Sequence, residues 1–265
     1  MRANTRNPLL RARRELWEYG QEKKNVAAIS AAAGIQCNGT PTYDAYRALT
    51  DSMLYFDTRT KTEELVEEAA LERRLAERVL RDQPLRLAFS GRLDPMKGAH
   101  HLPPLAAALK RRGVAFEMSV CGGGTVVDAM TRDIERLRVG DVLTMRGVLD
   151  FRSELVPFVR EAVDVFVCPH VQGDPSCTYM ETFALGVPIV GYDNEAFQGL
   201  VELGPVGWSS PLGDIERLAD RITWLDCNRE SIAARSRFAR TLAEDHTMER
   251  TFARRLEHLG ALARS

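Results

Sequence analysis

From Pro84 onward, short runs of apolar residues alternate with longer stretches in which apolar side chains recur every three or four positions. The short runs are typical of buried strands, and the longer stretches are typical of amphipathic helices. The predicted strands are residues 85–91, 115–122, 142–147, 163–169 and 187–192. The predicted helices are residues 98–113, 125–138, 153–162, 178–186, 215–225, 231–244 and 248–263. Strands that are each separated by a helix indicate an α/β domain with a Rossmann-like, doubly wound parallel sheet.

The first 80 residues are less regular and do not form a domain by themselves. We expect helices over residues 10–33 and 40–49, strands over residues 35–39 and 52–58, and a long charged helix over residues 63–82. The acidic residues of the last helix come early and its basic residues late, which suits the helix dipole.

Composition excludes several classes of protein. The 265 residues contain 36 Lys and Arg against 37 Asp and Glu, so no overall charge attracts nucleic acid or an acidic membrane, and anion binding must be local. The five cysteines are widely spaced, without a C-x-x-C pair, which favours reduced thiols in the cytoplasm and no metal site. No apolar stretch is long enough for a signal peptide or a membrane span.

Polar and glycine-rich segments follow the predicted strands. In doubly wound sheets, ligands bind beyond the carboxyl ends of the strands, where the strand order reverses. The segments at these ends are residues 90–92, 122–124, 146–147, 169–170 and 192–194. We therefore expect the ligand site among them.

The segment SGRLDPMKG, residues 90–98, carries two cations directly after the first predicted strand. Gly91 allows a tight turn close to a ligand. Arg92 offers a planar fork of donors and Lys97 a compact charge, a combination that suits two linked phosphates. The alternative is that both are solvated loop cations.

Residues 170–194 contain a second candidate region. A helix that starts near Ser176 or Cys177 would present free backbone N–H groups to an anion. Glu181 lies one turn inside this helix, where its carboxylate could accept hydrogen bonds from the two hydroxyls of a ribose. The alternative for Glu181 is simple complementarity to the helix dipole.

Histidines and cysteines give weaker signals. His170 stands at a strand end and either contacts the ligand or is satisfied by loop carbonyls. His100 and His101 are typical of surface or packing residues. Cys177 has no base partner in the sequence, which favours a packed thiol over a nucleophile.

Six segments in order resemble the donor-binding half of retaining glycosyltransferases of the GT-B fold, the family called group one or family four. They are SGRLDPMKG, VCGGG, VLTMRG, VDVFVCPH, METFALGVPIVGYDN and GWSSPLGDIERLADRI. The resemblance covers residues 84–260. It implies transfer of a sugar from a UDP- or GDP-linked donor with retention and without a metal or other cofactor, in polysaccharide or glycan biosynthesis.

The resemblance also implies roles for single residues. Arg92 and Lys97 would hold the diphosphate and stabilise the charge that grows as the glycosidic bond breaks. Glu181 would bind the ribose. The remaining donor-binding residues would be Gly91, Gly122, Gly123, Gly147, Val148, His170, Ser176, Cys177 and Thr178.

One position departs from the family pattern. The family places a second Glu eight positions before the ribose-binding one, where it touches the donor sugar, and this chain has Gly173 there. The adjacent Asp174 could substitute after a small shift of the loop, and it is therefore a candidate catalytic residue.

The resemblance implies an incomplete first domain. Residues 1–56 would be the remnant of the amino-terminal acceptor domain and residues 57–265 the donor domain, with about 150 residues missing. We expect exposed apolar surface, with a homodimer or a partner chain completing the cleft. The acceptor would be a glycan, a lipid-linked molecule or a small molecule, and the protein would be cytoplasmic or membrane-peripheral.

Two other functions stay open. The chain could be a nucleotide-sugar-binding module that is inactive without a separate acceptor domain. A nucleotide-sugar epimerase of the same fold would place other acidic and histidine residues in the cleft.

Overall fold

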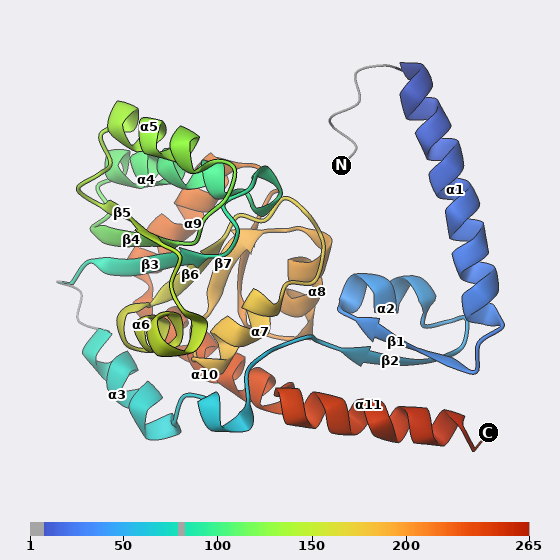
Figure 1. Ribbon diagram of the computed structural model, residues 1–265. Helices are drawn as coiled ribbons and strands as arrows, with labels where there is room; N and C mark the ends of the chain where they lie inside the picture. The colour runs from blue at the N-terminus through green and yellow to red at the C-terminus, as the bar shows by residue number, and fades with distance from the viewer. Residues whose placement is uncertain (1–7, 79–82, 265) are drawn as a thin grey trace.

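The computed structural model describes residues 8–78 and 83–264. In this part of the chain, six parallel strands form the central sheet in the order β5-β4-β3-β6-β7-β8 (Figure 1). The strands are β3 (Leu85–Ser90), β4 (Phe116–Cys121), β5 (Leu143–Gly147), β6 (Val165–Cys168), β7 (Ile189–Tyr192) and β8 (Gly207–Ser210). The predicted fold class and the five predicted strands are confirmed, and β8 was missed.

The order of the strands reverses between β3 and β6. The chain runs outward from β3 through β4 to β5, and then returns to β6, which pairs with the other side of β3. Such a reversal opens a crevice at the carboxyl ends of the two central strands. The loops that follow β3 and β6 therefore border the expected ligand site.

Helices cover both faces of the sheet, as Figure 1 shows. One face carries α4 (Leu102–Arg111), α5 (Val127–Leu137) and α9 (Ile215–Cys227), and the other carries α6 (Val156–Ala162), α7 (Cys177–Ala184), α8 (Glu195–Leu203) and α10 (Arg229–Asp245). Phe89 packs into the first layer, while the neighbouring Ala88 packs into the second, as alternation along a strand requires. Burial of a large apolar side chain contributes about 1.5–3 kcal/mol.

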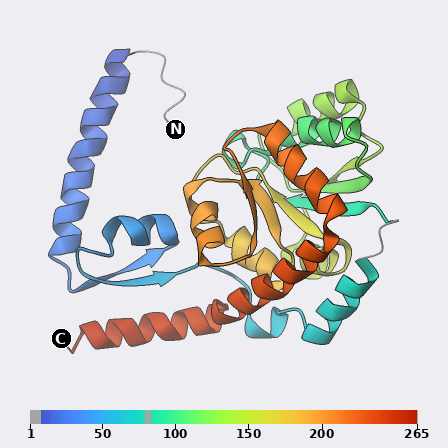
Figure 2. The ribbon, with the colours of Figure 1, turned by 180° about the vertical axis from the view of Figure 1, so that it is seen from behind.

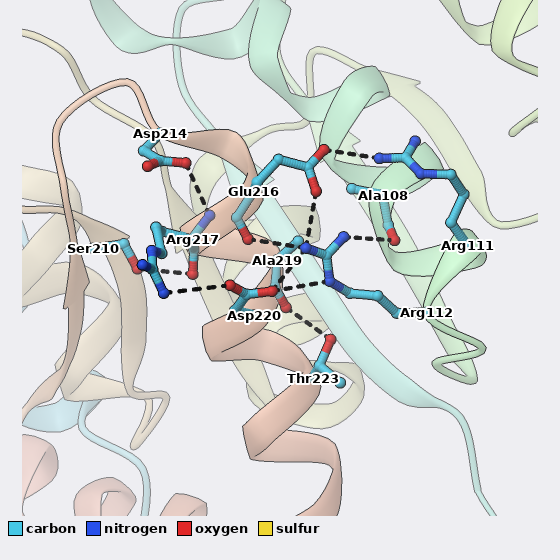
Figure 3. A network of polar contacts seen from close by, with 10 residues as sticks. All are labelled: Ala108, Arg111, Arg112, Ser210, Asp214, Glu216, Arg217, Ala219, Asp220 and Thr223. Carbon is cyan, nitrogen blue, oxygen red and sulfur yellow. Dashed lines mark hydrogen bonds and ion pairs between the residues drawn. The ribbon is translucent and has the colours of Figure 1, made fainter.

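A surface network of charges joins α4 to α9 (Figure 3). Arg111 Nη2 donates to Glu216 Oε1 at 2.8 Å, and Arg112 Nη2 donates to Asp220 Oδ1 at 2.7 Å. Asp214 caps α9 by accepting from the backbone N–H of Arg217 at 3.0 Å. The network ties together two helices that share one face of the sheet.

A small unit precedes the main domain. It contains α1 (Pro8–Ser30), β1 (Gly34–Asn38), α2 (Thr40–Tyr46) and β2 (Asp51–Tyr55), and β1 and β2 form a separate parallel pair. The last helix, α11 (Met248–Leu262), returns to this unit, as Figure 2 shows from behind. Gln36 Nε2 donates to the backbone oxygen of Arg255 at 2.8 Å, and the Arg255 guanidinium lies 4.2 Å from the Tyr55 ring centroid.

The segment between the two sheets differs from its prediction. The single helix expected over residues 63–82 is a 3₁₀ turn, η2 (Thr62–Glu64), followed by α3 (Glu68–Arg78). The break occurs because Val66 is buried and its N–H donates to the oxygen of Ala184 at 2.9 Å. Residues 79–82 lie outside the described part of the chain.

Apolar surface is exposed on both terminal helices, as expected. On α1, Leu16 and Trp17 are 73% and 64% exposed, and on α11 Phe252 and Leu256 are 51% and 66% exposed. A dimer or a partner chain that covers these side chains stays a prediction, and so does the domain boundary at residue 56.

Candidate functional site

The loop after β3 carries the first predicted cation, Arg92, as an exposed side chain. Gly91 adopts a φ of 152°, and Arg92 follows with its side chain 66% exposed. Its Nη1 lies 3.4 Å from Asp94 Oδ2. Hydrogen bonds from the side chain and backbone of Thr125 hold the pKa of Asp94 below its usual range. Arg92 is therefore anchored only loosely and can turn toward an anion.

Lys97 ends a 3₁₀ turn, η3 (Pro95–Lys97), and is largely buried. Its Nζ lies 3.6 Å from Asp174 Oδ2 in the loop after β6. The N–H groups of Val171 and Gln172 both donate to the oxygen of Met96, at 3.2 and 3.3 Å. These bonds join the loops after β3 and β6 and fix Lys97 at the point where the strand order reverses.

The next residue, Gly98, permits this close approach. It has a φ of 64°, and a Cβ atom at this position would overlap the carbonyl oxygen of Pro169. Only glycine avoids both the backbone strain and the overlap. A second 3₁₀ turn, η4 (Ala99–His101), then leads into α4.

Helix α7 presents its start to the same edge of the sheet. Ser176 is the N-cap residue, followed by Cys177 and Thr178 in the first turn. Glu181 lies one turn further, with its side chain 10% exposed. Both carboxylate oxygens accept from Arg59, Oε1 from Nε at 2.7 Å and Oε2 from Nη2 at 3.2 Å.

Two adjoining hollows connect these elements. The larger, about 350 Å³, is lined by Arg92, Gly122, Gly123 and Val148, and the smaller, about 100 Å³, by Thr178 and Glu181. Both hollows share five further lining residues, which are Arg59, Ser90, Gly91, Phe151 and Leu155. The structure therefore brings the loop after β3 and the helix that carries Glu181 to one continuous site. The larger hollow is in the size range of small-molecule sites.

Glycines leave room at the floor of the larger hollow. A Cβ at Gly122, which has a φ of 136°, would overlap the carbonyl oxygen of Gly91. The Gly122 N–H donates to the oxygen of Gly147 at 2.6 Å, and Gly147 has a φ of 71°. Val148 follows with its side chain exposed over the hollow. The loops after β4 and β5 thus expose backbone there.

Of two residues predicted to bind a donor, His170 is packed into the protein and Cys177 is partly exposed. His170 is 1% exposed, its Nδ1 lies 3.4 Å from Tyr179 Oη, and burial lowers its pKa to about 3. The Cys177 Sγ lies 3.8 Å from Asp57 Oδ2, and burial raises the pKa of this thiol. His170 is therefore a neutral packing residue, and the raised pKa of Cys177 favours its protonated thiol. The interpretation of Cys177 as a packed thiol stays a prediction.

Position 173 leaves little room for a side chain. A Cβ on Gly173 would lie 3.2 Å from Cβ of Glu195. The neighbouring Asp174 reaches Lys97, and its role stays a prediction.

Sequence reasoning missed Arg59 and Phe151. Arg59 lies in the crossover after β2, and its guanidinium stacks 4.0 Å above the Phe151 ring centroid. Phe151 begins a short π-helical turn, η5 (Phe151–Leu155). No local signal in the sequence indicates that a linker residue meets a carboxylate 122 positions later.

No metal cluster and no membrane span are found in the part of the chain that the structure describes. It contains no group of three or more His, Cys, Asp or Glu side chains that could hold a metal ion. None of its helices is both long and apolar enough to cross a bilayer. Metal independence and cellular location stay predictions.

The strand order, the covering helices and the hollow at the reversal point define a Rossmann-like α/β domain. Residues 72–241 match the family model described as glycosyl transferases group 1. Because this match covers more than half of the chain, the protein belongs to that family.

Two relatives of this chain are glycosyltransferases whose names refer to a biosynthetic product. WcaL of Salmonella typhimurium, a glycosyltransferase named for colanic acid biosynthesis, is 31% identical over 145 residues, 52% of this chain and 35% of the relative. AmsK of Erwinia amylovora, named for amylovoran biosynthesis, is 28% identical over 144 residues, again 52% and 35% of the two chains. The match thus spans about a third of each relative's length.

Solved structures of similar fold are GT-B glycosyltransferases. Anabaena Alr3699/HepE in complex with UDP has a TM-score of 0.70 at 16% identity, covering 88% of this chain and 65% of that one. Sucrose-phosphate synthase from Thermosynechococcus elongatus has a TM-score of 0.68 at 19% identity, covering 91% and 61%. At these identities the likeness shows the fold alone.

Proposed function

We propose that this chain is the donor-binding half of a retaining glycosyltransferase that moves a hexosyl-type sugar from a UDP- or GDP-linked donor to an acceptor. The observation that carries the proposal is the continuous site at the reversal of strand order. Arg92 borders it on one side and Glu181 on the other. The names of the relatives favour a role in polysaccharide assembly, with a glycan, lipid-linked or small-molecule acceptor.

In the proposed reaction, the bond between the anomeric carbon and the phosphate oxygen breaks, and the leaving diphosphate keeps the electron pair. The anomeric carbon bonds to a hydroxyl oxygen of the acceptor, and the proton of that hydroxyl passes to the leaving diphosphate. Arg92 and Lys97 would stabilise the charge that grows on this group, so no metal ion is required. The start of α7, at Ser176, Cys177 and Thr178, would add backbone donors.

The nucleoside would lie along the larger hollow. Gly122 and Gly123 leave space for it, and exposed backbone near Gly147 and Val148 would meet the base edge. Glu181 would accept hydrogen bonds from the ribose. Asp174 would face the donor sugar, in place of the glutamate that position 173 lacks.

A second candidate function is nucleotide-sugar binding without transfer. It is favoured by the small two-stranded unit, because a Rossmann-like acceptor domain needs a larger sheet than β1 and β2 provide. In that case these residues would bind the donor, and transfer would need a separate acceptor domain.

Calorimetry with UDP, GDP and their hexose conjugates tests the proposal. We expect saturable binding of at least one nucleotide, with affinity that survives chelation of divalent metals. Sugar release or transfer from the bound conjugate supports the enzyme, whereas binding without either supports the binding module. Absence of binding to every compound contradicts both.

A further inference from the structure

Arg59 and Arg92 line the hollows, and Lys97 follows in the same loop as Arg92. Each of these three cations pairs with an acidic side chain. Two pairs are long contacts, 3.4 Å from Arg92 to Asp94 and 3.6 Å from Lys97 to Asp174. The third differs, because Arg59 and Glu181 form two hydrogen bonds, at 2.7 and 3.2 Å. Arg92 and Lys97 can exchange their acidic partners for a phosphate at low cost. The Arg59 guanidinium, in contrast, already donates hydrogen bonds from both Nε and Nη2.

Glu181 can still accept hydrogen bonds while it is paired with Arg59. An ionised carboxylate has about four lone-pair sites, and a bidentate arginine uses one on each oxygen. The remaining site on each oxygen can accept one hydroxyl. The pair is therefore arranged for the two neighbouring hydroxyls of a ribose, one on each oxygen.

The backbone on both sides of Arg59 is fixed. Thr58 and Thr60 are 6% and 5% exposed, and the Thr60 N–H donates to Thr58 Oγ1 at 3.1 Å. The oxygen of Thr60 accepts from the N–H of Met248 at the start of α11, at 2.9 Å. Phe151 supports the guanidinium plane from below. Arg59 thus stands on a rigid segment that also joins the small unit to the main domain.

We propose that Arg59 is a positioning residue that holds the Glu181 carboxylate in the orientation for both ribose hydroxyls, and so makes the site selective for ribonucleotides. The inference rests on the proposed function. It adds that the crossover between the two sheets supplies part of the donor site, through a side chain that lines both hollows and acts on the ribose by way of Glu181.

The opposite role for Arg59 predicts a different result. If the ion pair were a latch that blocks Glu181, removal of the guanidinium would strengthen nucleotide binding. If the pair only stabilised the fold, its removal would weaken all nucleotides equally. A positioning residue instead changes the preference for ribose.

The experiment measures the dissociation constants of UDP and GDP and of their 2′-deoxy counterparts by calorimetry. The variants are Arg59→Met, which keeps the stem and removes the fork, and Arg59→Lys, which keeps the charge. Arg237→Met is the matched control, since Arg237 makes the same two-bond contact with Glu72, at 2.6 and 2.7 Å, and neither residue lines the hollows. Thermal melting without ligand checks that each variant folds. If Arg59→Met does not fold, the comparison is made with Arg59→Lys alone.

We expect the unaltered protein to prefer the ribonucleotide by about tenfold or more, the effect of one hydrogen bond to a charged group. Arg59→Met should reduce this ratio to below about threefold, Arg59→Lys should give an intermediate ratio, and Arg237→Met should leave it unchanged. An unchanged ratio in both Arg59 variants, tighter binding by either, or no ribose preference in the unaltered protein overturns the inference while the proposed function stands. Failure of the unaltered protein to bind either ribonucleotide overturns the proposed function itself.

Discussion

Two charged regions of this molecule use the same residue types differently. In the network between α4 and α9, Arg112 and Asp220 meet at 2.7 Å, and Arg111 and Glu216 meet at 2.8 Å (Figure 3). At the edge of the sheet, Arg92 and Lys97 stand 3.4 and 3.6 Å from their acidic neighbours. The cations of the first region form short hydrogen bonds with their acidic partners. The cations of the second region make only long contacts, so their donors remain available to a ligand.

The difference shows what distinguishes a structural cluster of charge from a binding site. Arg112 packs between two helices, and its partners lie on one helix face, so a ligand would have to break short bonds to reach it. Lys97 is held by its backbone between two loops, while its side-chain contact is long. A ligand that replaces this contact gains a charge-assisted hydrogen bond at little cost.

The largest expected effect concerns the backbone that brings the site loops together. Gly98→Ala should lower the free energy of unfolding by at least about 3 kcal/mol, because a Cβ there would overlap the Pro169 oxygen and φ is positive. Gly213→Ala, beside the α4–α9 network, should cost only about 1–2 kcal/mol, because φ is positive there and no atom lies within 4 Å. Urea unfolding measures both, and equal losses would contradict the close approach of the loops.

The next effect separates the cations of the two regions. Lys97→Ala and Arg92→Ala should each weaken nucleoside diphosphate binding by about 1.5–3 kcal/mol, the range for hydrogen bonds to charged groups. Arg112→Ala should leave the dissociation constant unchanged, because Arg112 lies at the end of α4, outside the loop after β3, and is bonded to Asp220 of α9. Calorimetry measures these dissociation constants. Unchanged affinity in both Lys97→Ala and Arg92→Ala would contradict the assignment of these two residues to the phosphates.

Acid should act in part through the site region, because His170 is buried there. Its pKa is about 3 in the folded protein, against about 6.5 when unfolded, owing first to burial and then to Lys97. Above about pH 6.5 the side chain is neutral in both states. Below it the unfolded chain binds a proton that the folded chain does not, so stability falls with pH until about 3, by up to about 1.4 kcal/mol per unit.

The variant His170→Gln tests this dependence. Its free energy of unfolding should fall less steeply between about pH 7 and pH 5 than that of the unaltered protein, by about 1–2 kcal/mol over the interval. Parallel curves would indicate that His170 is already protonated or already exposed.

Sequence patterns were sufficient for the five strands that are rich in apolar residues, since short apolar runs between helices are typical of the buried strands of a parallel sheet. Strand β8 was missed because Gly207–Ser210 is not an apolar run. It pairs with β7 because Gly207 allows close approach, as a Cβ there would overlap the Ile189 oxygen.

The candidate site was predictable where it depends on local sequence. Gly91, Arg92 and Glu181 stand directly after a strand or inside a helix start, and strand ends meet at one edge of a parallel sheet. Arg59 was not predictable, because its contact with Glu181 depends on the path of the crossover. The burial of His170 depends on the packing of Tyr179 and Phe89 around it.

The smallest effect is expected from breaking the α4–α9 network itself. Arg112→Met removes the hydrogen bonds to Asp220 and keeps the apolar stem that packs between the helices. Exposed and half-exposed ion pairs contribute about 0.2–1 kcal/mol each, so the free energy of unfolding should fall by about 1 kcal/mol or less. Because salt screens such pairs, the loss should shrink further when urea unfolding is repeated at about 1 M salt. A loss above about 3 kcal/mol, or one that salt does not reduce, would mean that Arg112 matters as much for stability as Gly98. The contrast between a surface network of ion pairs and a site built on fixed backbone would then no longer hold.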